Sequence, residues 1–287
     1  MEMPHFSVLR QEGANMKLHE LPIGTKVREP ESGHCFLVAA QDHPGYRGTV
    51  LVMDRIVRKG CFDAKEPLSS MPKVQKYGNN DYAASNVHQW LNSEKSNWYV
   101  PAHGCDTPPS GENISIPAHS YDGEPGFLGR FPKAFLERLV ENQIPCVSTQ
   151  EDGCRAVTVP AKFFLLSADE LGLRRFTGVP EGNLMPLFRD YRMRLGIKAA
   201  DPADFNFPGE VSENNTEMCW YYWLRTPHHA EPFLTAHIHF SGYISYIHAW
   251  NSDLGILPAC AVESDTEVRE IPDVEPFYEF RLGGAEA

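Results

Sequence analysis

Four short apolar runs in the last part of the chain decide the fold: CWYYWLRTP (219–227), FLTAHIHF (233–240), GYISYIHAW (242–250) and LGILPACAVE (254–263). These runs are rich in β-branched and aromatic residues, which favour strands. Short segments such as SG and NSDLG separate them, and such segments are typical of turns between antiparallel strands. The sequence therefore predicts a sheet of four short strands in this region.

A short helix is expected before this sheet, in the segment YGNNDYAASNVHQWLNSE (77–94). Ser85 is a natural N-cap residue, and the pattern that follows it ends near Asn92. Three apolar positions between them have the spacing of one helix face. They are Val87, Trp90 and Leu91.

Two more helices are predicted farther along the chain. The longer one begins at Pro132, a residue favoured in the first turn, and its apolar residues repeat at helical spacing as far as Val140. The segment 142–145, with Asn and Pro, is expected to end it. The weaker helix is SADELGL (167–173), in which Ser167 is the expected cap.

Extended segments and loops account for most of the remaining chain. Residues 18–57 alternate apolar runs with turn signals and predict a β-meander, and residues 163–166 predict a buried strand. The stretch 98–131 is rich in Pro and Gly and is expected to be a long loop. Residues 181–215 are expected to form an irregular insertion, with some helix around 187–195.

This order of elements predicts an α+β fold with small antiparallel sheets, two main helices and long loops. Residues 17–262 are expected to form the folded domain, after an N-terminal extension (1–16) and before an acidic C-terminal tail (263–287). Four tryptophans lie in apolar or helix-patterned stretches and are expected to anchor the core. They are Trp90, Trp98, Trp220 and Trp223.

Composition excludes several classes of partner. The chain of 287 residues has 26 Lys and Arg against 38 Asp and Glu, so its net charge of -12 disfavours nucleic acid. Its most apolar stretches, 161–166 and 219–224, are far shorter than the roughly 20 residues needed to span a bilayer. The first 18 residues lack the pattern of a secretory signal, which predicts synthesis in the cytoplasm. The seven cysteines include no Cys-x-x-Cys pair and are expected to be reduced thiols.

Several phrases, in a fixed order, resemble an uncharacterised domain family of gut bacteria and their prophages. That family has the C-type-lectin-like fold, and the resemblance covers roughly residues 18–262. Its members include the variable proteins of diversity-generating retroelements, in which mutagenic reverse transcription directed at adenines rewrites the last part of the gene. The phrases are YGNNDYAASNVHQWLNSE (77–94), EPGFLGRF (124–131), FFLLSADELG (163–172), YYWLRTP (221–227) and LGILPACAV (254–262).

In those variable proteins the rewritten stretch lies between a Trp-Leu-Arg-Thr/Ser-Pro entry and a Gly-x-x-Pro-Ala exit. Here residues 223–227 match the entry and residues 255–259 match the exit, so the resemblance implies a variable bracket at 223–259. Leu257 stands where many relatives carry Arg, which puts any role of that side chain in doubt. The resemblance implies a non-enzymatic protein without a cofactor. The protein would be assembled into a phage particle or shown at the cell surface, and it would bind a protein or glycan ligand.

Composition inside the bracket favours the same function. Between residues 228 and 250 lie five of the twelve histidines and several aromatic residues, and Glu231 is the single charged residue. Such side chains suit binding loops. In the run 233–240, strand alternation turns His237 and His239 outward; the facing of the run 242–250 stays open. The predicted ligand-binding residues are His228, His229, Phe233, His237, His239, Tyr243, Ser245, Tyr246, His248 and Trp250.

Three alternatives remain open. The aromatic residues of the bracket can instead be the core of an ordinary half-buried sheet. A metal-dependent enzyme or sensor is a second alternative, because His237 and His239 with a third histidine could bind zinc. Catalysis of the formylglycine-generating type needs paired cysteines, and neither Cys219 nor Cys260 has an adjacent second thiol. The segment 79–81 resembles a turn more than a calcium site, and no metal is assigned.

Overall fold

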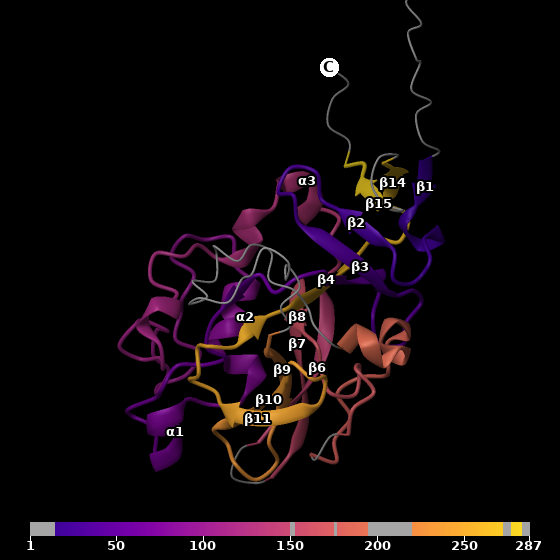
Figure 1. Ribbon diagram of the computed structural model, residues 1–287. Helices are drawn as coiled ribbons and strands as arrows, with labels where there is room; N and C mark the ends of the chain where they lie inside the picture. Colours follow the sequence, from indigo (N-terminus) through magenta and orange to yellow (C-terminus); the bar gives the residue numbers. More distant parts are fainter. Residues whose placement is uncertain (1–14, 150–152, 175–176, 195–219, 272–276, 283–287) are drawn as a thin grey trace, which may run out of the picture.

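The computed structural model describes residues 15–149, 153–174, 177–194, 220–271 and 277–282. Strands dominate these residues and form two larger sheets and a separate two-stranded hairpin. Short helices and long loops lie around the sheets (Figure 1). The protein is therefore a mixed α+β fold, as the sequence predicts. None of the helices within the described residues has the length and apolar character needed to cross a membrane.

The largest sheet has eight strands in the order β1-β14-β15-β2-β3-β4-β13-β8. Neighbouring strands are antiparallel, except that β15 and β2 are parallel. All residues of β4, β13 and β8 are buried, so the core lies around these strands. The strand bounds are β1 (Asn15–Lys17), β2 (Lys26–Arg28), β3 (Cys35–Ala40), β4 (Thr49–Met53), β8 (Phe163–Leu165), β13 (Pro258–Val262), β14 (Glu267–Glu270) and β15 (Phe277–Phe280).

This sheet changes the predicted domain boundaries. The tail predicted at 263–287 contributes β14 and β15, and β14 pairs with β1 at the other end of the chain. Figure 1 shows these three strands together at one end of the molecule. Part of the predicted tail therefore belongs to the fold, whereas most of the predicted extension, residues 1–14, lies outside the described residues.

The second sheet has five strands in the order β11-β10-β9-β12-β5, and β9 and β12 are parallel. It contains the first three predicted terminal strands. The fourth run divides at Leu257: β12 joins this sheet, but β13 is buried between β4 and β8 in the larger sheet. The prediction of one four-stranded sheet is wrong for that run. The bounds are β5 (Arg58–Lys59), β9 (Tyr222–Pro227), β10 (Leu234–Ile238), β11 (Ile244–His248) and β12 (Gly255–Ile256).

The helices are shorter than predicted. The helix capped by Ser85 is confirmed as α2 (Asn86–Leu91), and the Ser85 hydroxyl accepts the His88 N–H. The second helix is limited to α3 (Lys133–Leu136). The chain then forms a hairpin of β6 (Asn142–Ser148) and β7 (Arg155–Ala161), which was not predicted. A further helix before α2, α1 (Pro72–Tyr77), was also not predicted.

The helix predicted from Ser167 does not form. The Ser167 hydroxyl accepts the Glu170 N–H as a cap would, but only turns follow, and Gly172 adopts a left-handed φ of 66°. Of the predicted insertion, residues up to 194 contain two short 3-10 helices, Pro186–Arg189 and Tyr191–Arg194. The rest of that prediction lies outside the described residues.

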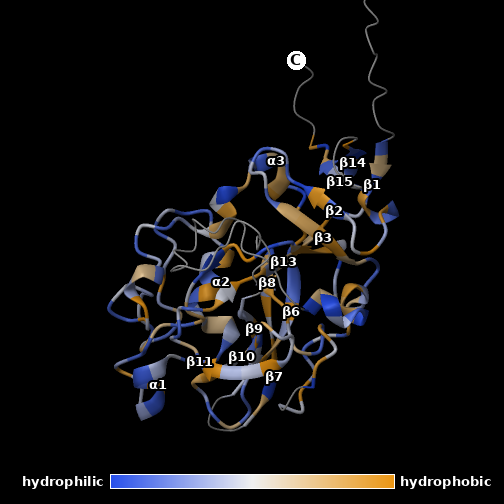
Figure 2. Ribbon diagram, in the orientation of Figure 1, coloured by the Kyte–Doolittle hydropathy of each residue, from blue (hydrophilic) through white to orange (hydrophobic). Residues whose placement is uncertain are grey.

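Aromatic side chains fill much of the core. Trp90, Trp98 and Trp223 are buried as predicted, whereas Trp220 is only partly buried. Figure 2 shows the contrast between β3, which is largely hydrophobic, and the hydrophilic α1 at the edge of the molecule. The six cysteines within the described residues are free thiols, and Cys219 lies outside them.

Candidate binding surface

The register of the β10–β11 hairpin determines where the predicted ligand-binding residues lie. Ala236 pairs with Tyr246, and His237 pairs with Ser245. Directly paired residues share one side of a sheet and successive residues alternate sides. Tyr246 therefore lies on one side of the hairpin, and His237 and Ser245 lie on the other. The predicted residues do not form a single surface.

His237 contradicts the prediction that it faces outward. Its side chain is only 5% exposed, and its ring lies 6.4 Å from the ring of Trp223, the residue with which it pairs on β9. Burial, followed by the nearby His239, lowers the pKa of His237 to about 4. The alternation along the strand was predicted correctly. The error arose because both sides of β10 are covered, as the complete burial of Thr235 and Ala236 also shows.

A partly exposed group of rings lies at the turn of this hairpin and is here called the hairpin-tip cluster: His239, Phe240 and Tyr243 from the turn, and Tyr221 from the residue before β9. The rings of His239 and Tyr243 are stacked 5.4 Å apart with an interplanar angle of 4°. Phe240 lies 4.0 Å from His239, and Tyr221 stands edge-on to both. Phe240 is 49% exposed and Tyr243 is 63% exposed. The tip thus presents aromatic area to solvent in a fixed arrangement.

Two other aromatic groups lie nearer the base of the hairpin. His228 is stacked on His229 at 4.8 Å and meets Tyr246 edge-on at 5.0 Å. Burial, and then the neighbouring His229, lower the pKa of His228. Burial, and then the Glu181 carboxylate, raise the pKa of Tyr246 to about 12. Among the three predicted histidines outside the strands, His229 is exposed and His239 is half-buried.

The third group combines predicted residues with a helix that the sequence did not predict. Tyr77, the last residue of α1, is stacked on His248 at 4.0 Å and also contacts Phe233 and Trp250. The Lys73 ammonium lies 4.8 Å from the centre of the Phe233 ring. Sequence reasoning missed Tyr77 because it precedes the segment in which helical spacing is evident.

Asn80 holds the loop that leads into this hairpin. Its side chain is fully buried, and its amide nitrogen donates to the carbonyls of His228, Glu231 and Leu234. Its backbone N–H donates to the Pro232 carbonyl at 2.9 Å. One residue outside the bracket therefore fixes the backbone of residues 228–234.

A buried ion pair fixes the entry to the bracket. Arg225 and Glu170 are both fully buried and form a two-pronged pair at 2.7 and 2.8 Å. The guanidinium also donates to the carbonyls of Pro145, Leu165 and Glu181, and the Tyr46 hydroxyl donates to Glu170. The nearby Glu181 is buried, which raises the pKa of its carboxyl to about 7 against the opposing effect of Arg225. Arg225 therefore bonds both to backbone carbonyls and to a carboxylate.

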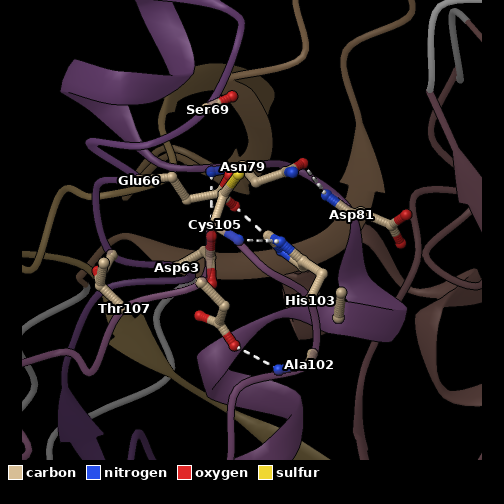
Figure 3. Close-up of polar contacts among 12 residues, drawn as sticks. Asp63, Glu66, Ser69, Asn79, Asp81, Ala102, His103, Cys105 and Thr107 are labelled. Atoms are coloured by element: carbon tan, nitrogen blue, oxygen red, sulfur yellow. Dashed lines mark hydrogen bonds and ion pairs between the residues drawn. The ribbon is translucent and has the colours of Figure 1, made fainter.

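A polar cluster near α1 and α2 was not predicted (Figure 3). Asp63 accepts the backbone N–H groups of Asn79 and Asn86, and Glu66 lies 3.3 Å from the His103 imidazole. Burial, and then the neighbouring Glu66 and Asp106, raise the pKa of Asp63 well above its usual range. These residues come from segments far apart in the sequence, so no local pattern could reveal the cluster.

The described residues also show where the side chains considered for a metal lie. No group of three or more His, Cys, Asp or Glu side chains in the described part of the chain is placed to hold a metal ion. His239 instead bonds to Ser241, and the segment 79–81 forms a turn in which Asn79 accepts the Asp81 N–H.

Comparison with known proteins gives one family. The model of the family described as "Domain of unknown function (DUF6273)" matches residues 47–264, which include β4, β13 and β8 of the larger sheet, the whole second sheet and the whole bracket. No curated protein and no solved structure matches the chain.

Proposed function

The chain belongs to the family described as "Domain of unknown function (DUF6273)", and from its geometry we propose that it is a non-enzymatic binding protein with the C-type-lectin-like fold. Its hairpin-tip cluster, together with the exposed His229 and the half-buried His228, contacts a protein or glycan ligand. In this proposal the chain is the variable protein of a diversity-generating retroelement, and the bracket 223–259 is the rewritten part.

The exposed hairpin-tip cluster is the observation that carries the proposal. Aromatic residues dominate the energetics of binding surfaces because they offer large contact areas with few rotatable bonds. Here Phe240 and Tyr243 are among the most exposed large hydrophobic side chains of the described residues, and both rings contact the ring of His239. A ligand that packs on this cluster would pay little entropy to order it.

Burial within the bracket supports the same proposal. The entry strand β9 and the exit residues 255–259 are buried, whereas the hairpin tip between them reaches solvent. Side chains that tolerate replacement would then lie at the tip. The entry residues 223–227 and the exit residues 255–259 would belong to the core. Several residues between the two ends are also buried, and two of them, Phe233 and His237, were predicted to bind the ligand.

The retroelement part of the proposal is tested at the nucleotide level. We expect a near-copy of codons 223–259, differing at adenine positions, close to the gene and beside a reverse transcriptase gene. Sequencing a population should then show variation at Phe240 and Tyr243 and none at Trp223. A locus without the near-copy would refute this part and leave the binding surface to the next experiment.

The surface is tested by probing the purified protein against a glycan array and a random-peptide phage library. For a ligand found in this way, the double variant Phe240→Ser and Tyr243→Ser should weaken binding by about 30-fold or more, since hot-spot aromatics contribute about 2 kcal/mol or more. Tyr191→Ser is the matched control, because Tyr191 is 65% exposed but belongs to another segment. Ligands that bind the double variant as tightly as the unaltered protein would refute the surface.

A further inference from the structure

The long loops that follow α2 form a hollow whose lining includes no residue of the β10–β11 hairpin. It has a volume of about 190 Å³ and is lined by segments 96–99, 108–110 and 121–124. Pockets for drug-sized ligands usually have volumes of about 300 Å³ or more. This hollow therefore suits one small chemical group.

Three aromatic rings line the hollow at steep angles to one another. The ring of Trp98 stands at 83° to that of Tyr99, with 6.3 Å between the centres, and at 65° to that of Tyr121, with 5.5 Å. Rings placed in this way cannot stack on each other, and they form the walls of a cage. The Trp98 indole N–H donates to the Glu124 carbonyl, and the Tyr121 hydroxyl donates to the Cys61 carbonyl, so both rings are fixed.

The charged residues in the lining are acidic. They are Asp122 and Glu124, and the lining includes no Lys, Arg or His. The Glu124 carboxylate forms ion pairs with Arg130 at 2.9 Å and with Arg58 at 3.9 Å. Asp122 is exposed and accepts the Gly111 N–H through one oxygen. Asp122 is therefore the carboxylate that a ligand can approach.

Carboxyl groups of the polar cluster lie close enough to Tyr99 to act on its hydroxyl. Burial, followed by Asp106, Asp63 and Glu66, raises the pKa of the Tyr99 hydroxyl, so the polar cluster of Figure 3 acts on this ring. The Tyr121 ring already accepts a cation, because the Arg58 guanidinium lies 4.3 Å from its centre. Aromatic faces attract cations through their quadrupole, and cages of such rings suit quaternary ammonium groups.

We propose that this hollow is a second binding site, independent of the hairpin surface, and that it takes a methylated ammonium group. Trp98, Tyr99 and Tyr121 form the cage walls, and Asp122 supplies the opposite charge at its mouth. The small volume accepts the head group, and the remainder of the ligand stays in solvent.

Choline is the probe, measured by isothermal titration calorimetry and by saturation transfer to its methyl protons. Its neutral carbon isostere, 3,3-dimethyl-1-butanol, tests the charge, and methyl glucoside tests whether the hollow takes a sugar instead. We expect saturable binding of choline and at least tenfold weaker binding of both comparison compounds. No saturable binding of choline, or equal binding of either comparison compound, would overturn the proposal.

Variants place the binding in the hollow. Tyr99→Leu should weaken choline binding by roughly 2- to 30-fold, the range of one cation–π contact. Asp122→Asn changes an exposed residue, so the variant should fold like the unaltered protein. It should weaken choline binding by about two- to fivefold. Tyr243→Leu removes an exposed tyrosine of the hairpin tip and should leave choline binding unchanged. Unchanged binding by Asp122→Asn together with Tyr99→Leu, or a loss in Tyr243→Leu, would place choline elsewhere and refute the site.

Discussion

Replacing Glu170 by Gln tests whether the buried ion pair beneath the bracket is truly charged. Glutamine keeps the shape of the side chain but removes the negative charge, and its NH₂ group would meet a donor of Arg225. The Arg225 guanidinium then remains fully buried without its counter-charge. Removing one partner of a buried pair costs about 3–5 kcal/mol. Since domains are stable by only about 5–15 kcal/mol, the loss should be large.

The assay is urea unfolding followed by tryptophan fluorescence. With a slope of about 2–3 kcal/mol per M, the midpoint for Glu170→Gln should fall by roughly 1–2 M. Tyr46→Phe removes only the hydroxyl that donates to Glu170 and keeps the ring stacked on Phe164 at 5.1 Å. It should cost about 1.5–3 kcal/mol, the range for a hydrogen bond to a charged group.

Glu137→Gln is the matched control. Glu137 forms an exposed pair with Lys133 one helical turn away, so its loss should change stability by less than about 0.5 kcal/mol. If Glu170→Gln lies within about 1 kcal/mol of the unaltered protein with an unchanged slope, Arg225 does not depend on a charged partner. The account of how the entry strand is fixed would then be wrong.

Three further predictions concern the same region. Tyr243→Ser should change stability by about 0.5 kcal/mol or less, whereas the buried His237→Ser should cost about 1–3 kcal/mol; equal melting temperatures would contradict the division between exposed and buried residues. The pKa of Glu181 is raised in the folded protein to about 7 from the ordinary 4.5, so the folded state holds the proton longer than the unfolded state does. The contribution of Glu181 to the free energy of unfolding should therefore fall by roughly 3 kcal/mol as the pH rises from about 4.5 to 7. Urea unfolding measured across this pH range should show this fall in the unaltered protein, and the fall should be absent in Glu181→Gln. Asn80→Ala should leave buried carbonyls unpaired and speed amide exchange of the residues 228–234; exchange as slow as in the unaltered protein would show that Asn80 does not hold the loop.

The elements that the sequence predicted correctly are those with local causes. The helix α2 follows from the Ser85 cap and from side chains spaced over two turns, and all of these interactions are within a few residues. The β6 strand was missed because the apolar positions within 135–140 fit a helical pattern, and because its partner β7 lies farther along the chain. The helical spacing was visible in the sequence, whereas the pairing of β6 with β7 was not.

The candidate site shows the same limit. Alternation along β10 could be predicted from the order of residues, but which side was covered depends on β9 and on the loops packed behind the hairpin. His237 is buried for that reason. The hollow of Trp98, Tyr99 and Tyr121 and the cluster around Asp63 also depend on long loops whose path no periodicity encodes.

The hydrogen bonds from Asn80 to the backbone of the loop have a consequence for protein engineering. Its bonds go to carbonyl groups at 228, 231, 232 and 234, and every amino acid supplies a carbonyl. The path of this loop is therefore largely independent of the side chains it carries, provided that the buried Phe233 anchor is kept. Libraries randomised at the exposed positions 229 and 230 should retain one loop conformation. The protein would then serve as a frame for selecting new binders without redesign of its backbone.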